Sequence, residues 1–169
     1  MPYDLPDTFP HVPLLPEELL RRHHIFEPLD HRFRSAARLL QSIWRQDREL
    51  PIGSYKVGAK RKKLGSRISP AAARAGANFM LPAIAWLVRR ELAYREPAAM
   101  IDEARLYGNL LSSMPMAFNV FGLLKLDLAF ASRVLAELFP DLSGAKVHAV
   151  LFEHSPGRGD PALTGDHSA

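Results

Sequence analysis

The chain has 169 residues, a hydrophobic fraction of 47% and a formal net charge of +4, values typical of one globular domain with a sizeable core. It contains no cysteine, which excludes disulfides, thiolate metal sites and a cysteine nucleophile. The sequence shows neither a signal-peptide pattern at its start nor an apolar run of eighteen residues. We therefore expect a soluble, cytoplasmic protein that has no membrane partner.

The charged residues are unevenly distributed along the chain. The stretch "KVGAKRKKLGSR", residues 56–67, holds six Lys or Arg residues and no acid, whereas from Asp127 to the end six acids face three bases. A basic front and an acidic back would suit a polyanion that is bound near a cation-dependent centre.

The N-terminal third is predicted to be a proline-rich arm followed by a helix. The first sixteen residues contain five prolines, so residues 1–29 are expected to form an arm. A helix is predicted from Asp30 to near Leu50, where Pro51 follows. Its expected buried face consists of Phe33, Ala36, Ala37, Leu40, Ile43 and Trp44. Its arginines are expected to form a second basic surface, made of Arg32, Arg34, Arg38, Arg45 and Arg48.

The middle of the chain is predicted to be mostly helical. The basic stretch is expected to be a loop, with only a weak strand pattern at residues 54–57. Helices are predicted over 69–80, with Ser69 as the cap and Pro70 at the first position, over 83–96, and over 127–139. Between them, residues 97–124 suggest a helix, a break and a dense apolar segment. The phenylalanines are expected in the core: Phe118, Phe121, Phe130 and Phe139.

One convincing strand is predicted at "AKVHAVLFEH", residues 145–154, with an apolar centre typical of a strand buried on both faces. A buried strand needs ladder partners for its backbone groups, and helices cannot supply them. We therefore expect a partner chain, or a C-terminal segment beyond Ala169, to complete the sheet.

Three stretches carry a resemblance to a known family: "NLLSSMPMAFNVFG" at 109–122, "VHAVLFEHSPGRGDP" at 147–161, and the closing "TGDHSA". They resemble the N-terminal part of bacterial restriction-endonuclease-like proteins of the PD-(D/E)XK nuclease superfamily. The resemblance implies a helix-rich α/β (α+β) fold, in which residues 30–169 form the N-terminal helices and first core strand of a nuclease-like domain. It also implies DNA as the substrate and Mg²⁺ as the cofactor.

The family's catalytic motif is missing from the sequence. Its metal-binding Asp lies on a strand after the point that "TGDHSA" matches, and its Glu-x-Lys comes later. No Glu-x-Lys or Asp-x-Lys occurs anywhere in the chain. We therefore expect an incomplete, truncated nuclease domain that is not active alone. The alternative is a non-catalytic helical module that binds nucleic acid or a partner protein.

Candidate acidic residues lie in the terminal loop and on the helices. The loop holds Glu153, His154, Arg158, Asp160, Asp166 and His167. Such carboxylates could hold a hard cation, although Asp and Gly are also the usual residues of a solvated turn. The resemblance places Asp160 and Asp166 at the border of an active site and implies a further helix glutamate. Of Glu91, Glu103 and Glu137, Glu103 is favoured because it lies nearest the resembling stretch.

The basic residues are the candidates for nucleic-acid binding, because lysine and arginine neutralise phosphates without reading the base sequence. These candidates are Lys56, Lys60, Arg61, Lys62, Lys63, Arg67 and Arg158. A solvated loop is the alternative interpretation of the same run. The sequence does not identify a metal ligand set.

Overall fold

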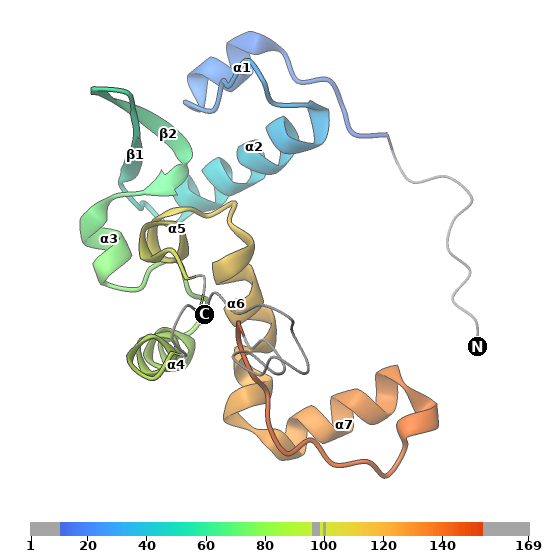
Figure 1. Ribbon diagram of the computed structural model, residues 1–169. Helices are drawn as coiled ribbons and strands as arrows, with labels where there is room; N and C mark the ends of the chain where they lie inside the picture. Colours follow the sequence, from blue (N-terminus) through green and yellow to red (C-terminus); the bar gives the residue numbers. More distant parts are fainter. Residues whose placement is uncertain (1–10, 96–98, 100, 154–169) are drawn as a thin grey trace, which may run out of the picture. The chain divides into compact units, whose positions relative to one another are not determined.

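The computed structural model describes residues 11–95, 99 and 101–153, and it divides the chain into two compact units (Figure 1). Unit 1 comprises Met1–Ala72 and unit 2 comprises Ala73–Ala169. The described residues form seven helices and one two-stranded sheet, which confirms the expected helix-rich α+β class.

Unit 1 contains α1 (Glu17–Arg22), α2 (Arg32–Asp47) and an antiparallel hairpin of β1 (Ile52–Val57) and β2 (Lys60–Ile68). The basic stretch that was expected to be a loop is therefore part of a hairpin, and that expectation was wrong. The turn has Gly58 at its first central position with φ of +59°, which is the requirement of a type II′ hairpin turn. Figure 1 shows the tip of this hairpin extending past α2.

The prediction of an arm over residues 1–29 was wrong for residues 17–22, which form α1. Leu20 on this helix and Ile25 just after it are buried, together with Leu64 and Ile68 of β2. Residues 17–29 are therefore built into unit 1, and the two units divide at Ala72 rather than at residue 29. Prolines in "MPYDLPDTFPHVPLLP" gave no signal for the short helix that follows them.

Helix α2 packs on β2 through polar side chains, contrary to the predicted face. Ser42 is fully buried and Arg45 is 7% exposed, whereas Phe33 and Leu40 are 66% and 67% exposed. Arg45 donates from Nε to the Gly65 carbonyl at 2.9 Å and from Nη1 to the Leu50 carbonyl at 2.7 Å. Burial lowers the pKa of Arg45. The helix is thus held by hydrogen bonds that hydrophobic periodicity cannot anticipate.

The contact between β2 and the end of α1 requires a glycine at position 65. A Cβ there would lie 2.1 Å from the His23 carbonyl oxygen and 2.6 Å from Ser42 Oγ. The Gly65 amide also donates to the His24 carbonyl at 2.8 Å. Backbone therefore approaches backbone at this point more closely than any side chain would allow.

Unit 2 is helical and contains α4 (Pro82–Ala93), α5 (Glu103–Gly108), α6 (Ser113–Leu126), α7 (Leu128–Leu138) and the 3₁₀ turn η1 (Pro140–Leu142). The short helix α3 (Pro70–Arg74) contains the boundary between the units. Ser69 caps it by accepting from the Ala72 amide at 3.3 Å, as expected. The core of unit 2 joins α4, α5, α6 and the loop before α4, and its buried residues are Phe79, Ile84, Ala85, Val88, Leu106 and Phe118.

Polar side chains cap the starts of three of these helices, and two asparagines hold the loop before α4 in place. Asp102, Ser112 and Asp127 accept from backbone amides at the starts of α5, α6 and α7, at 3.1, 3.3 and 2.8 Å. The buried Asn78 side chain donates to the Leu106 carbonyl at 2.7 Å, and Asn119 donates to the Asn78 carbonyl at 3.1 Å. These bonds tie the loop before α4 to α5 and α6.

The strand predicted at 145–154 is not present in its described part, residues 145–153. Its Val147 amide donates to Ser132 Oγ of α7 at 2.9 Å, and Leu151 is 58% exposed. The only ladder within the described ranges joins β1 to β2, so this apolar run has no neighbouring strand there. The expectation that another chain or a further segment completes a sheet at this run stays a prediction.

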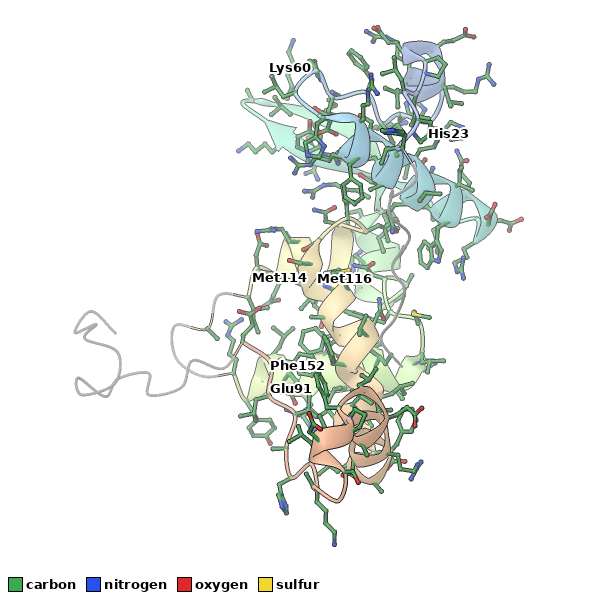
Figure 2. All side chains as sticks on the ribbon, turned by 90° about the vertical axis from the view of Figure 1, so that its right-hand side faces the viewer. His23, Lys60, Glu91, Met114, Met116 and Phe152 are labelled. Carbon is green, nitrogen blue, oxygen red and sulfur yellow. The ribbon has the colours of Figure 1, made fainter. Side chains whose placement is uncertain are left out.

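The prediction that Phe118, Phe121, Phe130 and Phe139 lie in the core was also wrong for three of the four rings. Phe118 is 3% exposed, but Phe121, Phe130 and Phe139 are 49%, 38% and 54% exposed. Met114 of α6 packs against the core, while Met116 is 61% exposed (Figure 2). No single described helix is long and apolar enough to cross a membrane, and only the pair α6 and α7, bent by 112°, meets that length and composition together.

Candidate nucleic-acid interface

The hairpin of unit 1 presents the basic stretch on two faces. Residues that are paired across an antiparallel ladder project to the same side of the sheet. The register pairs Lys56 with Arg61, and Ser54 with Lys63, at alternate positions of the ladder, so these side chains share one face. Lys60 pairs with Val57, and Lys62 pairs with Tyr55, on the opposite face.

The first face concentrates positive charge without compensation in the described part of the chain. Lys56 and Arg61 lie directly opposite one another, an arrangement of like charges that destabilises a strand pair. Arg61 Nε donates to Ser54 Oγ at 3.1 Å, and no carboxylate forms an ion pair with either cation within the described residues. A polyanion laid along this face would relieve the repulsion.

The tip of the hairpin adds Lys60, which is exposed and projects from the end of the ladder in Figure 2. Val57, its neighbour across the turn, is 50% exposed, so the tip has no packing of its own. Lys56, Lys60, Arg61 and Lys63 are therefore the predicted binding residues that are exposed and form no ion pair within the described residues.

Two other predicted residues anchor the base of the hairpin. Lys62 Nζ lies 2.9 Å from Glu27 Oε1 and donates to the Phe26 carbonyl at 3.1 Å. Tyr55 donates to the same Glu27 oxygen at 2.7 Å, and burial, assisted by this bond and by the Glu27 charge, raises the pKa of Tyr55. The Arg67 guanidinium lies 5.4 Å from the Tyr55 ring centroid.

The expected second basic surface on α2 is reduced by two internal arginines. Arg38 pairs with Asp30 and donates to Ser66 Oγ at 3.1 Å, and its side chain is 11% exposed. Arg45 is buried, as described above. Of these five arginines, only Arg32, Arg34 and Arg48 remain exposed.

The predicted helix glutamate, Glu103, lies on the surface of unit 2. It is the first residue of α5, its side chain is 61% exposed, and it pairs with Arg95 at 3.3 Å. Glu137, the other exposed candidate, is on α7.

Glu91 of α4 is the most enclosed of the three helix glutamates. Its side chain is 17% exposed and its Oε2 lies 2.7 Å from Lys125 Nζ of α6. Figure 2 places it beside Phe152, whose ring stacks on Phe118 at 4.1 Å and lies 5.6 Å from Lys125 Nζ. Glu91, Lys125 and Phe152 line a pocket of about 370 Å³.

The sequence carries a signal for the enclosed position of Glu91. Glu91 follows Ile84 by seven positions and Val88 by three, so it lies on the edge of the buried face of α4. A carboxylate on such a face is expected to have a partner, because an unpaired buried charge is costly. The identity of that partner, Lys125, is not encoded by spacing.

The described residues do not fit a metal site. Within them no three His, Asp or Glu side chains come together, and Glu91 is already paired with a cation that would repel a metal ion. Three predicted residues, Arg158, Asp160 and Asp166, lie outside the described residues, as do His154 and His167.

Comparison with known proteins identifies the superfamily. A family model described as the PD-(D/E)XK nuclease superfamily matches residues 28–169, which is most of the chain. The chain belongs to this superfamily, whose nucleases generally use divalent metal ions, and this confirms the resemblance found in the sequence. Comparison with curated proteins and with solved structures gave no match.

Proposed function

We propose that this chain is the DNA-binding part of a Mg²⁺-dependent DNA endonuclease of the PD-(D/E)XK superfamily, and that it does not cleave DNA by itself. The observation that carries the proposal is the pairing of Lys56 with Arg61 across the hairpin. Lys63 lies on the same face, and Lys60 lies at the turn end of the ladder. Repulsion within this group is tolerable when DNA phosphates lie against it. The superfamily supplies the nuclease class, and it suggests nucleic acid as the substrate.

The inactivity of the chain alone is inferred from its sequence. It has no Glu-x-Lys or Asp-x-Lys, and the enclosed Glu91 is paired with Lys125 rather than with a second carboxylate. Mg²⁺ is proposed because it binds carboxylates together with substrate phosphates. Asp160 and Asp166 remain the candidates for bordering that centre, and no step is assigned to them.

The binding surface is tested by measuring affinity for a fluorescent DNA duplex over a range of salt concentrations. The variant K56A/K60A/R61A removes three exposed cations of the hairpin. If all three contact phosphates, the slope of log K against log salt should become shallower by about 2.7. The matched control R105A/R133A/K146A removes three exposed cations of unit 2 and should change the slope little. Equal effects of the two variants would contradict the proposed surface.

The catalytic half of the proposal requires a separate assay. Purified protein incubated with plasmid DNA and Mg²⁺ should leave the plasmid intact. Nicking or cleavage that stays with the protein through successive purification steps would overturn the proposed inactivity, while leaving the binding surface unaffected.

A partner-binding helical module is the second candidate, because α6 and α7 carry exposed apolar side chains. Val120, Phe121, Leu138 and Phe139 are 58%, 49%, 62% and 54% exposed. Failure of the chain to bind DNA even at low salt, together with self-association in light-scattering measurements, would favour this candidate over the first.

A further inference from the structure

A pocket of about 320 Å³ lies beside the hairpin and is not explained by a flat phosphate-binding surface. It is lined by Arg21, His24, Phe26, Lys62 and Lys63. No carboxylate is among these residues, and one aromatic ring accompanies the basic groups. A concave site of this chemistry suits a nucleotide, which combines an anionic phosphate with an aromatic base.

The wall of the pocket is fixed by the way in which α1 ends. The His24 amide donates to the Arg21 carbonyl at 2.9 Å and the Ile25 amide donates to the Leu20 carbonyl at 2.8 Å. These two bonds form a Schellman motif in which His24 has φ of +54°. Because Gly65 of β2 donates to the His24 carbonyl, the helix end and the hairpin hold the pocket between them.

Arg21 and Phe26 form a stacking platform in this pocket. The guanidinium carbon of Arg21 lies 4.1 Å from the Phe26 ring centroid, and Arg21 Nε donates to Glu17 Oε1 at 2.6 Å. A guanidinium that covers a ring on one side can stack against a base on its other side. Bases within a continuous duplex already stack on their neighbours, so such a platform favours an unpaired base.

The two lysines of the pocket have different settings. Lys62 is bonded to Glu27 and to the Phe26 carbonyl, so its charge is largely compensated. Lys63 forms no ion pair with any residue in the described part of the chain. Lys63 is therefore the cation available to a phosphate that enters beside the stacked base.

We propose that this pocket binds one unpaired nucleotide of a DNA strand, with its base on the Arg21–Phe26 platform and its phosphate beside Lys63 and His24. This inference rests on the proposed DNA binding and specifies its substrate class. The chain then prefers single strands, overhangs or strand junctions to continuous duplex, because only these offer a base face to the platform.

The test compares R21A with R22A in fluorescence anisotropy, using a short single strand and the blunt duplex of the same sequence. Both arginines are exposed and pair with a glutamate four residues earlier, but only Arg21 lines the pocket. R21A should weaken single-strand binding about tenfold and duplex binding much less, because it removes the guanidinium on which one base stacks. R22A should weaken both slightly and equally.

A second variant, Phe26→Leu, keeps an apolar side chain but removes the ring, and it should also reduce the preference for single strands. Equal single-strand affinities of R21A and R22A would overturn the pocket assignment, as would equally tight binding of single strand and duplex by the unaltered chain. If K56A/R61A still weakens both forms of DNA in that case, the hairpin surface stands. Binding of neither form at low salt would remove both proposals.

Discussion

The Glu91 carboxylate of α4 and the Lys125 ammonium of α6 lie 2.7 Å apart, and each side chain is about one-sixth exposed. This pair joins two helices that also meet through the core of unit 2. We expect Glu91→Gln or Lys125→Met to lower the free energy of unfolding by about 1–3 kcal/mol. The first change leaves the Lys125 ammonium without its carboxylate, and the second leaves Glu91 with only the Arg90 guanidinium, 3.6 Å from Oε1.

The double variant E91Q/K125M removes both charges and should cost less than the sum of the single changes. Urea unfolding followed by circular dichroism measures all three variants. Simple additivity would show that the two groups do not interact in solution. Arg95→Ala, which removes a more exposed ion pair with Glu103, serves as the comparison and should cost less than about 1 kcal/mol.

Gly65→Ala should severely destabilise unit 1. The added Cβ would lie 2.1 Å from a backbone oxygen, and neither the end of α1 nor β2 can move without breaking the hydrogen bond between Gly65 and His24. We expect a loss of more than about 2 kcal/mol, or failure to accumulate folded protein. Gly108→Ala is the control, since a Cβ there has no atom within 4 Å. Comparable losses for the two substitutions would contradict this account.

His24→Gly should make the protein more stable by about 1 kcal/mol, because glycine adopts a positive φ without the strain of a Cβ. Glu49→Gly is a matched control, since Glu49 has φ of +53° and ends α2 with the same pair of backbone bonds. Thermal unfolding should show similar gains for both variants. DNA affinity should fall only for His24→Gly; a fall for both, or for neither, would argue against a role of His24 in the pocket.

Arg45→Ala should cost about 2–4 kcal/mol, since it removes two hydrogen bonds of a charged donor and leaves the Gly65 and Leu50 carbonyls without that partner. Arg48→Ala, three residues later at the C-cap of α2, removes an exposed guanidinium that lies over Trp44 and should cost less than about 1 kcal/mol. Chemical denaturation of both variants checks this, and a larger effect at Arg48 would mean that α2 packs through its apolar side instead.

Local signals in the sequence predicted part of the helical structure. Ser69 caps α3 as expected, and α2, α4 and α7 overlap the ranges predicted for them, whereas the helix expected over 69–80 ends at Arg74. These features depend on neighbours within a few residues. The hairpin was missed because Lys60, Arg61, Lys62 and Lys63 lack the alternation of a half-buried strand.

Features that depend on distant partners could not be predicted from pattern. The apolar run at residues 145–153 has strand composition, but a ladder needs a neighbour that the pattern does not specify. Arg45 was assigned to a surface because its carbonyl partners, on Leu50 and Gly65, are invisible to charge counting. The enclosure of Glu91 could not be predicted for the same reason, because its partner Lys125 lies on another helix. A catalytic role of Glu103 or of Glu91 stays a prediction.

The hairpin has a base that packs on the helices of unit 1 and an end that does not, and its register is irregular at the base. Ile52 pairs with Ile68 while the next residue, Gly53, pairs with Leu64, so the residues of β2 between them serve the contacts with α1 and α2. The segment from Lys56 to Arg61 is exposed and does not pack against those helices. Exchanging that short segment for another turn sequence should therefore give a set of chains with equal stability and different polyanion preferences.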